Sequence, residues 1–170
     1  SIGTLVHEMI EAYLLKKQIK MKYDSFRIKN QVVQSFLNFK VWHTNMINQG
    51  YKLEPLYIEK TITCPWYGGT IDCVMKITSP SGDVKNYIID FKSSKNLSID
   101  YFLQTYAYAW SWNWNKIEMK ADIPLIDGGI GVIRCDKEYS RHEAIFLNMD
   151  RDADIFRNLD TGFASMLNWY

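Results

Sequence analysis

A predicted β-hairpin in the middle of the chain constrains the fold more than any other feature of the sequence. Residues 69–78 alternate apolar and polar side chains, and residues 85–92 contain the apolar run Tyr87-Ile88-Ile89. Between them lies Ser79-Pro80-Ser81-Gly82-Asp83, a cluster of residues that favour turns. We therefore expect two antiparallel strands that turn near Ser81.

The second of these strands ends on a charged pair, Asp90 and Lys92, separated by Phe91. Side chains alternate between the faces of a strand, so the two charges share one face. A turn near Ser81 would also place Asp72 across from Asp90 on that face, where like charges repel. A divalent cation would turn this repulsion into attraction, and Mg²⁺ prefers carboxylate oxygens and water as ligands. From the hairpin alone, a metal site and two exposed aspartates beside a loop are equally acceptable interpretations.

Lys92 favours the metal-site interpretation. Its ammonium group could reach a phosphate oxygen, or an attacking water near the metal. A desolvated lysine can also lose its proton and then orient or deprotonate water. The alternative, a surface lysine paired with a carboxylate, explains less of the arrangement.

The rest of the pattern predicts helices on both sides of a sheet. Helices are expected over residues 2–19, 24–49, 98–114 and 150–169, and further strands over 53–63, 129–134 and 143–148. This order indicates an α/β fold with a mixed sheet of about five strands flanked by helices. The length of 170 residues suits one domain, expected to span 1–170. Since the chain begins inside a helical pattern, we expect it to be truncated at its N-terminus.

Composition limits the class of protein. With 47% hydrophobic and 23% charged residues, the chain is typical of a globular protein, and it contains no apolar run of about 18 residues that would predict a membrane span. Its three cysteines lack metal-ligand spacing, so we expect neither a zinc site nor a disulfide framework. A cytoplasmic, intracellular location follows as an expectation, with a mitochondrial or phage-encoded origin left open.

The net charge of +1 does not indicate nucleic-acid binding, but basic residues gather in one short stretch. These residues are Lys16, Lys17, Lys20, Lys22, Arg27 and Lys29. A solvated helix end followed by a loop is the favoured interpretation, and a phosphate-binding patch is the alternative.

Four short motifs surround the charged pair in a fixed order. They are Gly3-x-x-x-His7-Glu8, Gly69-Thr70-Ile71-Asp72, Ile89-Asp90-Phe91-Lys92-Ser93-Ser94 and Gln104-x-x-x-Tyr108. In this order and secondary-structure context they resemble the PD-(D/E)XK nuclease superfamily, specifically its RecB-like exonuclease branch. That branch includes nuclease domains of bacterial recombination enzymes, CRISPR adaptation nucleases, phage nucleases and the mitochondrial genome maintenance exonuclease. The resemblance covers about residues 1–110 and implies a restriction-endonuclease-like core.

The resemblance also implies a role for each matching residue. His7, Asp72 and Asp90 would bind Mg²⁺ or Mn²⁺ together with the main-chain carbonyl of Phe91. Lys92 would be the catalytic lysine, acting with the two aspartates.

Four further residues would bind the substrate or support the catalytic groups: Gln104, Tyr108, Glu59 and Ser93. Gln104 and Tyr108 are four positions apart in a predicted helix and therefore share one of its faces. Core residues are expected on the opposite side, namely Phe102, Leu103, Tyr106 and Trp110.

The function implied by the resemblance is a metal-dependent deoxyribonuclease. We expect an exonuclease that prefers single strands or duplex ends and acts in DNA repair, recombination or phage DNA processing. A helicase or recombination partner would lie on another chain, since no helicase motif is present, and three scattered cysteines cannot supply an iron–sulfur cluster. A catalytically silent nucleic-acid-binding or assembly module, and a phosphodiesterase acting on small nucleotides, remain as alternatives.

Three tryptophans, Trp110, Trp112 and Trp114, stand at alternate positions of the predicted third helix. Such rings can stack on the bases of single-stranded nucleic acid. Core packing and burial at the helix end form the other interpretation, and the favoured one.

Overall fold

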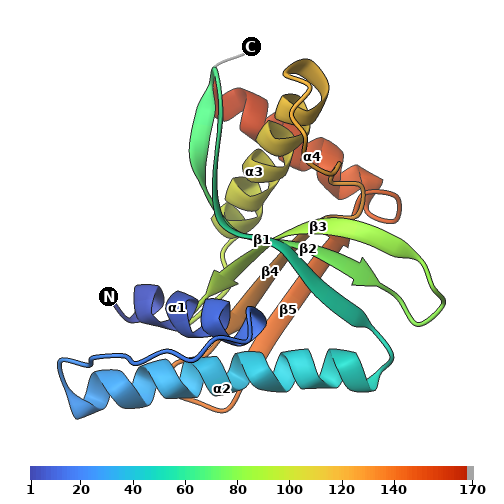
Figure 1. Ribbon diagram of the computed structural model, residues 1–170. Coiled ribbons are helices and arrows are strands. Elements are labelled where there is room, and N and C mark those ends of the chain that lie inside the picture. Colours follow the sequence, from blue (N-terminus) through green and yellow to red (C-terminus); the bar gives the residue numbers. More distant parts are fainter. Residues whose placement is uncertain (168–170) are drawn as a thin grey trace.

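One mixed sheet of five strands, in the order β1-β2-β3-β4-β5, organises the described residues, 1–167, of the computed structural model (Figure 1). The strands are β1 (Lys52–Cys64), β2 (Tyr67–Thr78), β3 (Val84–Lys92), β4 (Gly129–Cys135) and β5 (His142–Asn148). Neighbouring strands run antiparallel except β3 and β4, which are parallel. The chain crosses between these two through a helix, as a parallel connection requires.

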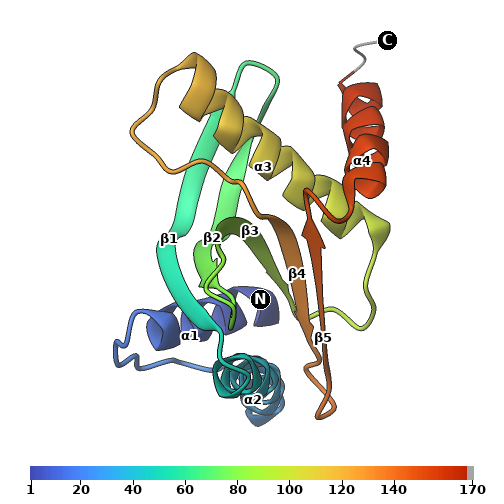
Figure 2. The same cartoon turned by 90° about the vertical axis from the view of Figure 1, so that its right-hand side faces the viewer.

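Two helices cover each face of the sheet (Figure 2). Helices α1 (Ile2–Leu14) and α2 (Phe26–Asn48) lie on one face, and α3 (Ile99–Glu118) and α4 (Ala153–Met166) lie on the other. Each face of the sheet has its own hydrophobic core, one including Phe39 and Met75 and the other including Val74 and Trp112. The expected α/β fold, a mixed five-stranded sheet flanked by helices, is confirmed. Among residues 1–167, no helix combines the length and apolar character needed to cross a bilayer.

The register of the central hairpin is the predicted one. Cys73 lies opposite Ile89, and Thr78 lies opposite Val84, so the turn is centred on Ser81. Within this turn, the Ser79 hydroxyl accepts a hydrogen bond from the Asp83 main-chain N–H, and Gly82 adopts a φ of 92°. The turn residues therefore determine the register through their own hydrogen bonds and dihedral angles.

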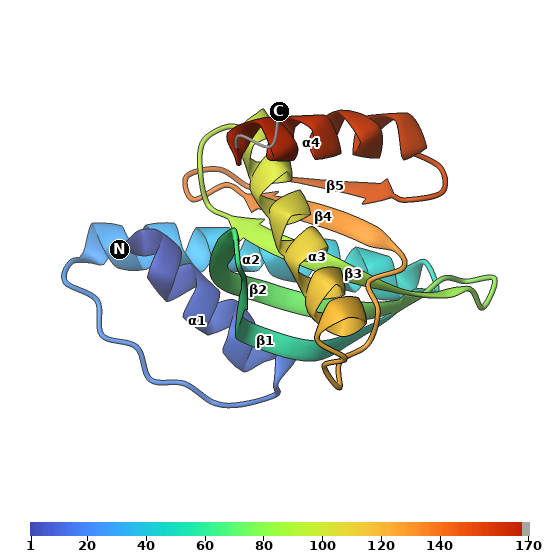
Figure 3. The same cartoon turned by 90° about the horizontal axis from the view of Figure 1, so that it is seen from above.

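Strand β2 parts from β3 halfway along its length. Its segment Cys73–Thr78 pairs with β3, whereas its outer segment Tyr67–Asp72 continues the ladder with β1. This outer part of the β1–β2 hairpin stands beside α3 (Figures 1 and 3). In β1, Glu59 lies next to the point of parting and adopts a φ of 51°, in the left-handed region that non-glycine residues rarely occupy.

The first helix is shorter than predicted. It ends at Leu14 instead of continuing to residue 19, and Lys16 adopts a left-handed φ of 55°. The apolar stripe ends at Leu14, and Ile19 is 45% exposed, so no packing holds a further turn in place. The basic residues that follow are exposed along the connection to α2 and in its first turn. Helix α4 is described as far as Met166, and its predicted end at 168–169 lies outside the described residues.

Candidate active site

Asp72 and Asp90 lie side by side where β2 and β3 part. The ladder ends with Cys73 opposite Ile89, and the two aspartates occupy the next positions, as the predicted register requires. The Phe91 main-chain N–H donates a hydrogen bond to Asp72 Oδ2 at 2.8 Å, and the two carboxyl groups are close enough for each to act on the pKa of the other. The end of the ladder thus places two carboxylates against each other.

This carboxylate pair is poorly solvated. Asp90 is 4% exposed, and its buried Oδ2 atom makes an ion pair with Lys92 but accepts no hydrogen bond of good geometry from the described residues. Burial raises the pKa of both carboxyl groups, and the charge of Asp72 raises the pKa of Asp90 further, to about 7, against the opposing effect of Lys92. The pair therefore retains a proton up to about neutral pH, which is unusual for aspartate.

Lys92 is the cation nearest to Asp90. Its Nζ atom lies 3.2 Å from Asp90 Oδ2, and it also lies 4.9 Å from the centre of the Tyr101 ring. The lysine side chain is 25% exposed, so it connects the buried carboxylate to the surface. Phe91, between Asp90 and Lys92, turns to the other face and packs in the core beneath α1 and α2.

His7 reaches the site from the opposite helical layer. Its Nε2 donates a hydrogen bond to the main-chain carbonyl oxygen of Phe91 at 2.8 Å, and its Nδ1 lies 3.5 Å from Asp72 Oδ1. Helix α1 holds the histidine there by burying Val6 and Ile10 on either side of it. Two of the predicted metal ligands, the imidazole and the carbonyl, are therefore adjacent, and a metal bound to both would replace their hydrogen bond.

Glu59, which the family resemblance implies as a supporting residue, lies in the same neighbourhood. It lines a small cavity with His7 and Asp72, and its charge contributes to the raised pKa of Asp72, after the dominant effect of burial. Glu11, which the sequence interpretation did not include, lines the same cavity. Its position four residues after His7, on the same side of α1, is the signal that would have identified it.

Tyr108 packs against the strand that carries Asp72. A Cβ atom at Gly69 would lie 2.6 Å from Tyr108 Cε1, so the absence of a side chain there lets the ring lie on β2. The rings of Tyr108 and Tyr67 pack with their centres 5.8 Å apart, and burial raises the pKa of both hydroxyl groups. Gly69 and Tyr108, which belong to separate sequence motifs, therefore form one packing unit.

Helix α3 presents to the sheet the side that carries Tyr108, which corrects the prediction of its core face. Its buried residues are Thr105, Ala107, Tyr108, Ala109, Ser111 and Trp112. The residues expected in the core, Phe102, Leu103, Tyr106 and Trp110, are only partly buried. Because α4 packs against α3, both sides of α3 carry apolar residues, and the pattern alone could not distinguish them.

Gln104 lines a cavity of about 440 Å³ that opens beside Lys92. Tyr67 and Tyr101 line it as well, and the sequence interpretation included neither. Tyr67 follows the tight turn that joins β1 to β2, and Tyr101 stands in the first turn of α3. No sequence motif connects them, since their proximity arises only from the folded β1–β2 hairpin.

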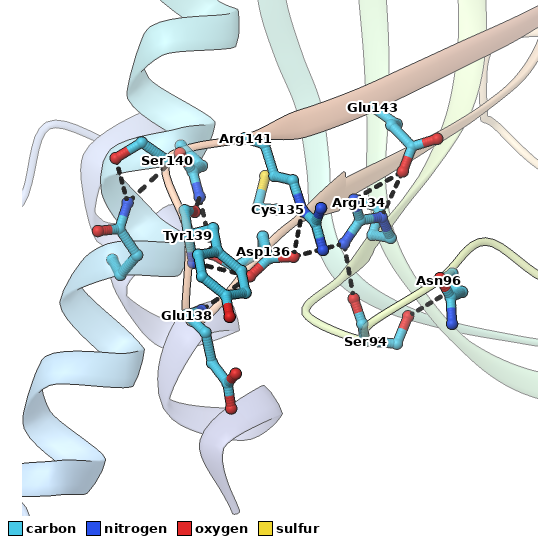
Figure 4. A network of polar contacts seen from close by, with 12 residues as sticks. Ser94, Asn96, Arg134, Cys135, Asp136, Glu138, Tyr139, Ser140, Arg141 and Glu143 are labelled. Carbon is cyan, nitrogen blue, oxygen red and sulfur yellow. Dashed lines mark hydrogen bonds and ion pairs between the residues drawn. The ribbon is translucent and has the colours of Figure 1, made fainter.

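Ser93 is not brought to the carboxylates. Its hydroxyl lies on the side of Gly3 in α1, and it lines a separate cavity with Asp136. The neighbouring residue Ser94 is held by the buried Arg134, whose Nη1 donates to the Ser94 carbonyl oxygen at 3.0 Å (Figure 4).

Arg134 belongs to an ion-paired network. It pairs with Asp136 and with Glu143, and Arg141 also pairs with Asp136 (Figure 4). Arg134 is 2% exposed and lies opposite Lys92 in the parallel ladder of β3 and β4. The network therefore fixes the start of the loop that follows Lys92.

The tryptophans of α3 do not form one stacking surface. Trp112 is fully buried and donates its Nε1–H to the Pro124 carbonyl oxygen at 2.7 Å, which confirms the core interpretation for this residue. Trp110 packs edge to face against Trp66 and at a tilt to Phe163. Trp114 also packs edge to face against Trp66. Trp110 and Trp114 therefore both contact the turn that joins β1 to β2.

The carboxylate and carbonyl oxygens at this site are ligand types that a hard divalent cation prefers. Within residues 1–167, no three His, Cys, Asp or Glu side chains are arranged to hold a metal ion together. Mg²⁺, however, usually takes only one or two protein carboxylates and keeps several waters. Two adjacent carboxylates, with one buried oxygen that lacks a hydrogen bond, meet that need.

Comparisons with known proteins leave the family open. No family model and no curated protein matches the chain. Among solved structures, the crystal structure of SSO0001 is similar, with a TM-score of 0.31 and 12% sequence identity, over 96% of this chain and 85% of that one. A likeness of this size carries no argument about function.

Proposed function

We propose that this protein is a metal-dependent nuclease that hydrolyses phosphodiester bonds in DNA, built on a restriction-endonuclease-like core. The observation that carries the proposal is the buried pair Asp72–Asp90 with Lys92 Nζ 3.2 Å from Asp90. A buried carboxylate pair whose charge one lysine compensates only in part is costly in a folded protein, and a divalent cation relieves that cost. The sequence motifs that contain these residues support the same assignment.

Asp72 and Asp90 would hold Mg²⁺ or Mn²⁺, with the Phe91 carbonyl and His7 as further ligands. When bound, the metal lowers the pKa of a water ligand and stabilises negative charge on the phosphate. Lys92 would orient the attacking water or neutralise charge that develops in the transition state. Gln104, which lines the cavity beside Lys92, would contact the substrate, and Tyr108 would steady β2 beneath Asp72.

The proposal is tested by incubating the protein with end-labelled single-stranded and double-stranded DNA, with Mg²⁺, with Mn²⁺ or with EDTA. We expect metal-dependent hydrolysis that falls by about a hundredfold or more in Asp90→Asn and in Lys92→Ala, since loss of one charge-stabilising group costs about that much. Matched controls are Asp83→Asn, in the exposed hairpin turn, and Lys76→Ala, which is paired with Glu54 on the same sheet.

Three results would count against the proposal. Full activity in either site variant would exclude the assigned roles. Absence of metal binding by calorimetry would favour a silent nucleic-acid-binding or assembly module. Inhibition by mononucleotides but not by long DNA would favour a phosphodiesterase that acts on small nucleotides.

A further inference from the structure

We propose that the cavity beside Lys92 binds one unpaired nucleobase of the substrate, next to the phosphate that is cleaved; this inference rests on the proposed function. The cavity has a volume of about 440 Å³, within the range of sites that bind small molecules. Its wall is formed by residues from four separate parts of the fold: Tyr67, Lys92, Asp100, Tyr101, Leu103, Gln104 and Met166. Of these residues, only Lys92 and Gln104 already have a role in the proposed hydrolysis, as the catalytic lysine and as a substrate contact.

The apolar part of the wall suits the face of a base. Tyr67 and Tyr101 each supply an aromatic ring, and Leu103 and Met166 supply aliphatic surface. Every nucleobase has a flat aromatic face, and stacking on protein aromatics tolerates any sequence. The cavity would therefore accept a base without selecting which one.

The polar groups suit the rest of a nucleotide. Lys92 stands at the end of the cavity nearest to Asp90, where it would meet a phosphate. The Gln104 amide can both donate and accept hydrogen bonds, and the Asp100 carboxylate can accept them, so either can meet the edge of a base. Tyr67 lies near enough to Asp90 for the carboxylate charge to act on its hydroxyl group. Phosphate and base would thus occupy adjoining positions.

This arrangement has a consequence for strand preference. A base that enters a cavity between side chains must leave its partner strand, and unpairing costs free energy in duplex DNA. Single-stranded DNA or a frayed end meets no such cost. The cavity therefore predicts a preference for unpaired DNA at the cleaved position.

The experiment compares intact single-stranded DNA with strands that carry one abasic residue on either side of the cleaved phosphate. In the wild-type protein, removing the base that enters the cavity should slow hydrolysis about tenfold, and removing the other flanking base should have little effect. Tyr101→Ala should slow hydrolysis of the intact strand to a similar extent, without slowing that of the sensitive abasic strand. Tyr101→Phe keeps the ring and should restore the difference between intact and abasic strands that Tyr101→Ala loses.

The abasic strand separates stacking from an indirect effect on Lys92. Because Tyr101 also contacts the Lys92 ammonium group, its loss could impair catalysis with every substrate. Equal slowing of intact and abasic strands by Tyr101→Ala would overturn the proposal. The control Tyr139→Ala removes a tyrosine that is 60% exposed and lies outside the cavity.

A binding measurement tests the cavity even if no hydrolysis occurs. Calorimetry with deoxyadenosine monophosphate and with deoxyribose 5-phosphate should show about tenfold tighter binding of the nucleotide to the wild-type protein, and no difference in Tyr101→Ala. Equal affinity of the wild type for both ligands would refute a base site. Failure of the nuclease assay alone, with base-dependent binding retained, would refute only the proposed function.

Discussion

Asp90 is the residue whose environment departs most from its ordinary chemistry. It is buried, it faces Asp72, and Lys92 compensates its charge only in part. A structural aspartate in a core is normally paired and fully hydrogen-bonded, whereas Asp90 Oδ2 accepts no hydrogen bond from the described residues. Such an arrangement is typical of a site that a ligand completes.

The raised pKa of Asp90 predicts how stability depends on pH in metal-free buffer. Its pKa in the folded protein is about 7, above the ordinary value of 3.8, so the folded state holds a proton that the unfolded state has released. The resulting stabilisation is fully present below about pH 4 and is lost as the pH rises through 7. We therefore expect the contribution of Asp90 to the free energy of unfolding to fall between about pH 4 and pH 7 and to change little above that range.

The variant Asp90→Asn removes this titration. At pH 8 it should be more stable than the wild type by about 1 kcal/mol or more, since one pKa unit corresponds to about 1.4 kcal/mol. Thermal and urea unfolding in EDTA at pH 5 and pH 8 measure the difference, with Asp83→Asn as the control. A variant less stable than the wild type at pH 8 would contradict the prediction.

At the scale of elements, the central hairpin was predictable and its outer half was not. The turn residues around Ser81 and the alternation along β2 determine a register in which a slip of one residue would bury the wrong face. The separation of β2 from β3 has no comparable signal. It coincides with a left-handed Glu59 in β1 and with contact between the hairpin and α3, and no local sequence pattern records either feature.

The same limit applies to the candidate site. Asp72, Asp90 and Lys92 share one hairpin, so counting along the sequence was enough to bring them together. Tyr67 and Tyr101 meet the site only through tertiary packing, and Ser93, next to Lys92 in sequence, turns away from it. Residues that face each other on paired strands could be predicted by counting along the sequence. Residues that meet because a helix packs on the sheet could be predicted only from a known motif or from the structure.

The packing of β2 on α3 gives a prediction at this scale. In Gly69→Ala the new methyl group would overlap the Tyr108 ring, which is 9% exposed and has little room to move. We expect a loss of about 1–3 kcal/mol in the free energy of unfolding, as is usual for overpacking. Denaturant unfolding measures it.

A double-mutant cycle tests the cause. If the clash with Tyr108 is responsible, Gly69→Ala should cost much less in a Tyr108→Ala background, because the two sites are in contact. The same cost in both backgrounds would show that the strand backbone, not the ring, requires glycine.

At the scale of the whole molecule, the site joins the two helical layers through the end of the sheet. Helix α1 supplies His7 from one face, and α3 supplies Gln104 and Tyr108 from the other. The Arg134 network adds a connection between β4, β5 and the loop after β3 (Figure 4). Relative movement of the layers would therefore separate the histidine from the carboxylates.

The two hydrogen bonds made by Phe91, where β2 parts from β3, also have a consequence for the order of folding. The hydrogen bond between Asp72 and Phe91 spans 19 residues, whereas the one between His7 and Phe91 spans 84. Each doubling of loop length costs about 0.6 kcal/mol of closure entropy, so the longer loop costs about 1 kcal/mol more. We expect the hairpin to form first and α1 to dock last.

Pulsed hydrogen exchange during refolding would measure this order as amide protection in β2 and β3 before protection in α1. The variant Ile10→Ala, at a fully buried position of α1, should weaken the late phase and leave the early one unchanged. Simultaneous protection of both elements would contradict this order.

A partly folded chain would hold Asp72 and Asp90 together before His7 reaches them. The candidate site would then be complete only once the short helix α1 has docked.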